Sequence, residues 1–158
     1  GGASVGNVTV GGSVIGGSNS YSGVIGSLGT LGQVKVAHDL RGGGGDHSGM
    51  IFGIGNVAGV TIGGSFLGGS NTLSGAISSN ADLGPITIGH NMEGGTAAES
   101  GVIGSIGKMA TVTIGGSLVG GVIGGLFWKS DGKFQPAGLI LSIIGSMILI
   151  WAYLTFMK

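Results

Sequence analysis

The chain repeats itself every 26 residues, and this repeat restricts the possible folds more than any other feature of the sequence. When the first 121 residues are written in rows of 26, apolar residues fall into columns without a single gap. Two of these columns contain only β-branched residues: Val8, Val34, Val60, Ile86 and Val112 in the first, and Ile25, Ile51, Ile77 and Ile103 in the second. A disordered Gly/Ser-rich linker would not keep apolar residues in register. The repeat therefore predicts a stack of similar structural units.

Each row contains short strands separated by sharp turns. Segments 7–10 and 23–28 have the β-branched content and alternation of half-buried strands, and Gly-Gly or Gly-Ser-Asn follows such segments. Glycine makes up 40 of the 158 residues, and it suits corners that need a positive φ or a close backbone approach. Asn19 and Asn71 share a column, and we expect left-handed conformations there too.

These features predict an all-β parallel β-solenoid, or β-helix, with 26 residues and three short strands per coil. A flattened β-sandwich of repeats and silk-like stacking are the alternatives. Gly1 falls in the column of Ser27, so the array begins in mid-coil. Open edge strands recruit further strands, and we expect either a longer array or self-association into a homo-oligomer or filament.

A hydrophobic segment follows the repeats. Residues 136–157 form an uncharged run of 22 residues, which as a helix would be ~33 Å long and would match a hydrocarbon core of about 30 Å. We predict a β-solenoid over 1–121, a linker over 122–135 and a transmembrane helix over 136–157, with a helix buried in a filament core as the alternative. Small residues that permit helix–helix contact would share one face of it: Gly138, Ser142, Gly145 and Ser146.

Two family resemblances accompany these segments. Segments 120–128 and 138–150 are similar to the C-terminal half of the small bacterial transglycosylase-associated membrane proteins, a resemblance that covers about 113–158. It implies short Gly-rich transmembrane helices and no catalytic residues. Rows such as Val-Thr-Ile-Gly-Gly-Ser-Leu-Val-Gly-Gly at 112–121 resemble the Gly-rich repeats of bacterial surface or exported β-solenoid proteins, which implies a passive scaffold or adhesin role. Both patterns include 113–121, which we assign to the fifth coil.

The sequence contains few residues suited to catalysis or metal binding. Six basic and six acidic residues are too few for a nucleic-acid footprint, and the absence of cysteine excludes thiolate chemistry. Asp46-His47-Ser48 has the residue types of a nucleophile triad, but Ser48 shares its column with Ser22, Ser74 and Ser100, which favours a turn hydroxyl. His38 and His90 would lie two coils, or roughly 9.6 Å, apart, too far to share one metal ion. We expect no catalytic residue, metal, cofactor or small-molecule substrate.

One outward column is a candidate binding surface. Thr9, Thr61, Thr87 and Thr113 share it, interrupted by Lys35. A threonine file on a β-solenoid could bind ice, carbohydrate or another surface, although threonine is also an ordinary surface residue of strands.

The sequence as a whole predicts a non-enzymatic structural scaffold at the cell surface, membrane-anchored or extracellular. The C-terminal helix would anchor or assemble it. The alternatives are a filament subunit with this helix packed in the assembly core, and a binding module that uses the threonine column.

Overall fold

The computed structural model describes residues 2–120 and 122–123. The chain divides into two compact units, Gly1–Gly125 and Leu126–Lys158. The second unit, with the predicted transmembrane helix and its small residues Gly138, Ser142, Gly145 and Ser146, lies outside the described residues. Within the described part, no helix has the length and apolarity needed to cross a membrane.

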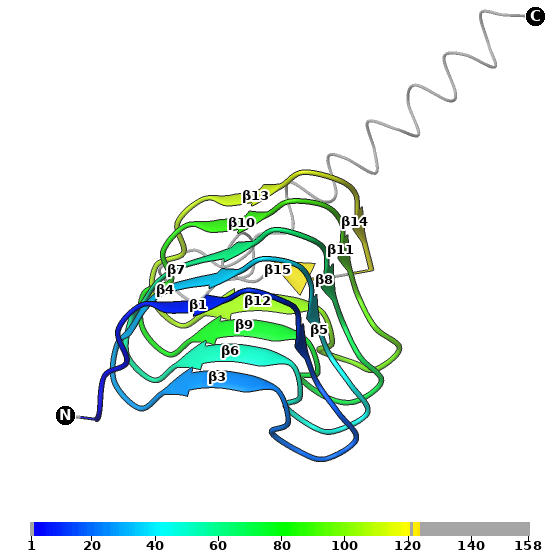
Figure 1. Cartoon of the computed structure of the whole chain (residues 1–158), viewed down its shortest axis with the longest axis horizontal. Helices are drawn as coiled ribbons and strands as arrows, with labels where there is room; N and C mark the ends of the chain where they lie inside the picture. Colours follow the sequence, from blue (N-terminus) through cyan, green and yellow to red (C-terminus); the bar gives the residue numbers. More distant parts are fainter. Residues whose placement is uncertain (1, 121, 124–158) are drawn as a thin grey trace, which may run out of the picture. The chain divides into compact units, whose positions relative to one another are not determined.

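The described residues form a parallel β-solenoid made of three five-stranded sheets (Figure 1). Each coil adds one strand to each sheet, as the sequence predicts. The first sheet consists of β1 (Val8–Val10), β4 (Leu31–Val36), β7 (Val57–Ile62), β10 (Ile86–Ile88) and β13 (Val112–Ile114). The second consists of β2 (Val14–Ile15), β5 (Leu40–Arg41), β8 (Phe66–Leu67), β11 (Met92–Glu93) and β14 (Leu118–Val119). The third consists of β3 (Val24–Ser27), β6 (Met50–Gly53), β9 (Ala76–Ser79), β12 (Val102–Ser105) and β15 (Val122–Ile123).

Strand pairing follows the 26-residue repeat until the last strand. Val8 pairs with Val34 and Ile25 pairs with Ile51, as the apolar columns predict. In the third sheet, however, Val102 pairs with Val122, a step of 20 residues. The six missing residues correspond to 18–23, the long corner between the second and third sheets of the first coil. A constant period of 26 therefore predicts the end of the array at Gly121, whereas the third sheet continues into β15.

The apolar columns fill the interior of the solenoid. Val34, Val60 and Ile86 are 1% exposed, and Ile51, Ile77 and Ile103 are fully buried. The members from the end coils, Val8, Val112 and Ile25, are partly buried and pack against this core. Each central coil has a neighbour on both sides, and this explains why burial is most complete there.

The long corners contain left-handed residues at positions that sequence reasoning missed. Positive φ angles of 50–58° occur in one column at non-glycine residues, namely Tyr21, His47, Leu73 and Glu99. The expectation that Asn19 and Asn71 take this conformation is wrong. Their carbonyls instead accept hydrogen bonds from the amides of Ser22 and Ser74. These bonds close four-residue turns, in which the third residue requires a positive φ.

We predict that Glu99→Gly stabilises the solenoid. Glu99 is exposed and has a φ of 58°, a conformation that costs an L-residue about 1–2 kcal/mol relative to glycine. Part of this gain is offset because glycine makes the unfolded chain more flexible, so the net gain should be about 0.5–1 kcal/mol. Thermal unfolding followed by far-UV circular dichroism measures it. Glu99→Ala, which removes the carboxylate but keeps Cβ, should not show the gain, and equal effects of the two variants would contradict the explanation.

Candidate functional site

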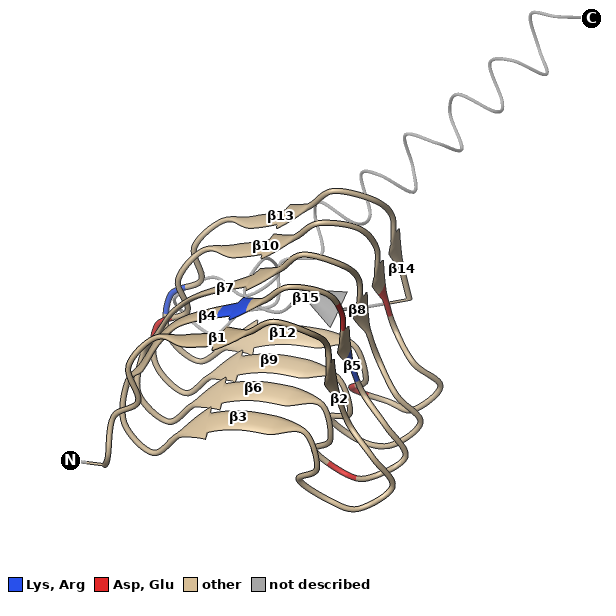
Figure 2. Ribbon diagram, in the orientation of Figure 1, with Lys and Arg blue, Asp and Glu red and all other residues tan. Residues whose placement is uncertain are grey.

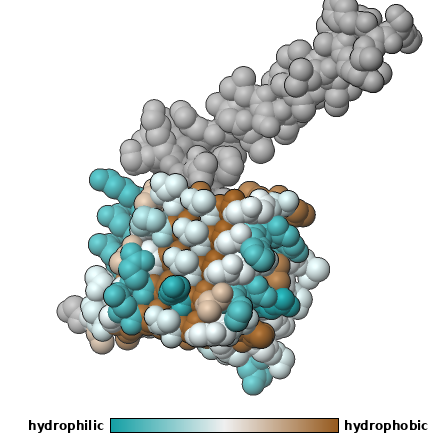
Figure 3. All heavy atoms as spheres, turned by 45° about the horizontal axis from the view of Figure 1, so that its top comes forward, coloured by the Kyte–Doolittle hydropathy of each residue, from teal (hydrophilic) through white to brown (hydrophobic). Residues whose placement is uncertain are grey.

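The outward threonine column lies on the first sheet. Thr9 pairs with Lys35, Lys35 with Thr61, Thr61 with Thr87, and Thr87 with Thr113. All of these residues are exposed except Thr61, which is half-buried. Figure 3 shows a face on which hydrophilic residues gather along two sides, with weakly polar and apolar residues between them. The threonine file has the expected geometry, and its role in binding stays a prediction.

Charged side chains are few and dispersed over the described coils (Figure 2). On the second sheet, Arg41 and Glu93 are separated by Leu67, with which each of them pairs through the backbone. Arg41 does not reach Glu93 and binds Asp39 of its own coil, at 2.8 Å between Nη2 and Oδ2. This face therefore lacks a concentrated charge that could attract a polyelectrolyte.

Asp39 links two coils at the corner between the first and second sheets. Its Oδ1 accepts a hydrogen bond from the amide of Ser65, 26 residues later, at 2.8 Å. This hydrogen bond, followed by the interaction with Arg41, holds the pKa of the Asp39 carboxyl below its ordinary value of 3.8. Asn91 repeats the arrangement, since its Oδ1 accepts from the amide of Ser117 at 3.0 Å. The Asp39 carboxylate thus takes over a backbone partner that the corner leaves without a ladder bond.

The residues Asp46, His47 and Ser48 do not form a nucleophile triad. Ser48 is completely buried, and its hydroxyl donates to the carbonyl of Gly45 and accepts from the amide of Gly43. Nδ1 of His47 lies 2.9 Å from Oδ2 of Asp46, and its ring stacks on Tyr21 with 5.0 Å between centroids. The serine hydroxyl is therefore bonded to backbone rather than to the imidazole.

The other serines of this column hold the long corners in the same way. Ser22, Ser74 and Ser100 each donate a hydrogen bond to the carbonyl three residues earlier, at 2.5–2.7 Å. Asn19, Asn71 and Ala97 supply these carbonyls. The serine recurs because each long corner needs one hydroxyl at this point.

The two histidines of one column are separated by an intervening coil. The amide of Gly64 donates to the carbonyl of His38, and the amide of His90 donates to the carbonyl of Gly64. In residues 2–120 and 122–123, no group of three or more His, Cys, Asp or Glu side chains could hold a metal ion. These histidines therefore belong to an ordinary polar edge.

Comparison with known proteins identifies similarity only for the end of the chain. A family model described as transglycosylase associated protein matches residues 113–158, which is less than a third of the sequence. No curated protein and no solved structure matches the chain. The matched segment begins inside β13 and includes β14 and β15. The resemblance of the tail to this family is therefore supported, and the segment shared with the repeat lies in the fifth coil.

We predict that Ser48→Ala destabilises the solenoid by about 1–3 kcal/mol, because it leaves buried backbone groups of the corner without their hydroxyl partner. Thermal unfolding of the full chain provides the measurement. Ser20→Ala is the matched control, since Ser20 is an exposed serine of the equivalent corner one coil earlier, and it should change stability little. A Ser48→Ala protein as stable as the Ser20→Ala protein would show that the hydroxyl is dispensable.

Asp39 should contribute stability that disappears in acid. Its pKa is lowered in the folded state, so its contribution is complete above the unfolded pKa and is lost as the pH falls through the folded pKa. Asp39→Asn keeps an Oδ1 acceptor for Ser65, as Asn91 does for Ser117, but cannot ionise. The free energy of unfolding of the wild type should exceed that of Asp39→Asn at about pH 5, and the difference should shrink toward about pH 2. A difference that is independent of pH would contradict this assignment.

Proposed function

We propose that the chain is a non-enzymatic structural scaffold, exposed at the cell surface and attached to a membrane through its C-terminal hydrophobic segment. The observation that carries the proposal is the parallel stacking of fifteen short strands into three sheets. In such a stack the backbone itself supplies rigidity, because each inner coil is hydrogen-bonded on both sides.

The chemistry of the outer surface supports a passive role. Within the described residues, the serine of the only triad-like sequence is bonded to backbone, and the Asp39 carboxylate serves a corner. General acid–base or nucleophilic catalysis needs side chains with freely available reactive atoms in mutual reach. The polar side chains at these corners act instead as partners of the main chain.

Membrane attachment rests on the tail. The matched family model covers all of 136–157, and this run contains no charged residue. A segment of this length and composition is stable across a bilayer. Packing in the core of a filament would satisfy the same hydrophobicity, and this alternative predicts rods that form without lipid.

Vesicle flotation of the full chain tests the attachment. We expect the wild type to float with phosphatidylcholine–phosphatidylglycerol vesicles and to resist alkaline extraction. Ile144→Arg places a charge in the middle of the uncharged run, at a cost of about 2.5–3.5 kcal/mol at the bilayer centre, and should reduce the floating fraction. Ile15→Arg introduces the same charge at a residue of the solenoid that is 61% exposed and should float like the wild type.

Negative-stain electron microscopy of the same samples distinguishes the alternatives. Particles confined to vesicles or detergent micelles support the anchored scaffold, whereas rods in lipid-free buffer together with failure to float support the filament. Digestion of intact cells with a membrane-impermeant protease tests the surface location, and a solenoid that is cleaved only after lysis would refute it.

A further inference from the structure

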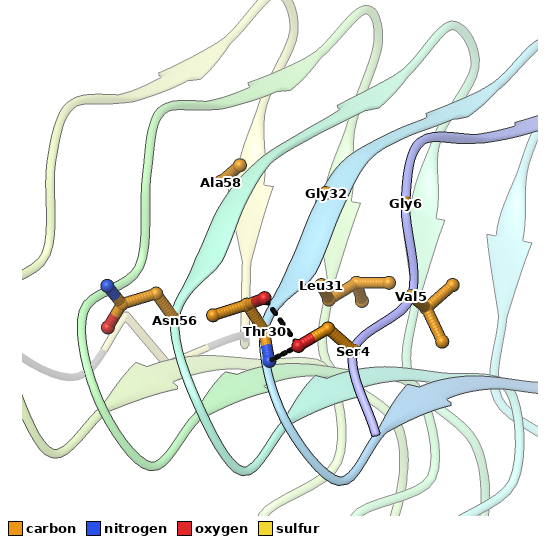
Figure 4. A pocket seen from close by; sticks show the side chains of 8 residues that line it. All are labelled: Ser4, Val5, Gly6, Thr30, Leu31, Gly32, Asn56 and Ala58. Carbon is orange, nitrogen blue, oxygen red and sulfur yellow. Dashed lines mark hydrogen bonds between the residues drawn. The ribbon is translucent and has the colours of Figure 1, made fainter. Parts of the chain in front are cut away.

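A shallow furrow follows the corner between the third and first sheets and crosses successive coils. It consists of two adjoining hollows of about 470 and 450 Å³, which share Asn56 and Ala58. Val5 and Leu31 line the first hollow, and Leu83 and Met109 line the second (Figure 4). Because equivalent residues recur once per coil, the furrow repeats at the strand spacing of about 4.8 Å.

The furrow is open because one of its columns contains only the two smallest residues. The residues at this position of successive coils are Gly6, Gly32, Ala58, Gly84 and Ala110. A Cβ at Gly6 would meet nothing within 4 Å, whereas a Cβ at Gly84 would collide with the backbone of Ala58. Close coil stacking therefore requires glycine at Gly84, and the column as a whole leaves the space above it empty.

The backbone along the furrow offers little to a ligand. The amides of Val5, Leu31, Val57 and Leu83 donate to carbonyls of the next coil, at 2.8–3.0 Å. A peptide strand that binds a sheet depends on free backbone donors and acceptors, and these are already used here. A ligand of the furrow must therefore be recognised by side chains.

The opposite wall carries one polar side chain per coil. In order along the furrow these side chains are Ser4, Thr30, Asn56, Asp82 and Lys108. Oδ1 of Asn56 accepts from the amide of Asp82, and Oδ1 of Asp82 accepts from the amide of Lys108. Nδ2 of Asn56 and Oδ2 of Asp82 form no hydrogen bond with the described part of the chain. Both side chains are exposed, so the wall presents donors and acceptors at regular intervals.

We propose that this furrow binds a linear, uncharged, β-linked oligosaccharide that lies along the solenoid axis. Sugar rings combine a C–H face, which suits the Gly/Ala column and the apolar floor, with hydroxyls at their edge, which suit the polar wall. A polymer that repeats can contact successive coils, and many weak contacts then add up. Asp82 is the single carboxylate that lines the furrow, and hydrolysis of glycosidic bonds commonly uses a pair of carboxyl groups. The ligand is therefore held and not cleaved.

Retention on insoluble glycans tests the inference, with full-length protein in detergent micelles. We expect the wild type to bind cellulose or chitin particles and to be released by cellohexaose or chitohexaose. Ala58→Leu fills the furrow and should abolish retention. Asn56→Ala removes one hydrogen-bonding group and should weaken binding about fivefold. Thr87→Leu enlarges an exposed residue of the threonine column, outside the furrow, and should bind like the wild type.

Three outcomes would overturn the inference: no retention of the wild type on either polymer, unchanged retention of Ala58→Leu, or loss of retention in Thr87→Leu alone. The last result would transfer binding to the threonine column. Thermal unfolding of Ala58→Leu and Thr87→Leu at matching temperatures ensures that a loss of retention reports on the furrow. The assay requires no membrane, so its failure would leave the scaffold proposal intact, and failure of flotation would leave the furrow intact.

Discussion

The structure depends on hydrogen bonds between backbones of neighbouring coils. A parallel ladder forms only if each coil has the same path as the one before it, and the 26-residue register maintains that identity from Val8–Val34 to Ile86–Val112. Once the backbones coincide, like side chains stack on like side chains, and the interior columns of valine and isoleucine follow. Core packing and strand pairing are thus two results of a single constraint.

Corners are the points where this constraint is hardest to satisfy, because the chain must turn while its amides still need partners. Polar side chains solve the problem in two ways. Ser48 and its equivalents bond to groups within the same corner, and Asp39 and Asn91 accept amides from the next coil. Most of the polar residues that resemble catalytic groups in the sequence serve this purpose. A solenoid surface can therefore be rich in reactive residue types and remain inert.

The sheets could be predicted from the sequence because the periodic apolar columns state the register directly. The left-handed residues could not, since the turn that starts at Asn19 transfers the positive φ to Tyr21, and side-chain preference alone does not reveal that hydrogen bond. Strand β15 was missed because a fixed period cannot accommodate a shortened corner. The furrow was also missed, because it arises where Gly6 and Gly84 lack side chains, and an empty space has no letter in a sequence.

The shortened corner determines how far the array can extend. A coil stacked beyond the fifth would need, for its own long corner, a template equivalent to 18–23, and the step from β12 to β15 omits those six residues. The copying of one coil by the next is thereby interrupted within a single turn. The number of repeats in this solenoid is then written in one local deletion, and a gene could lengthen or shorten the rod by moving that deletion without altering any coil before it.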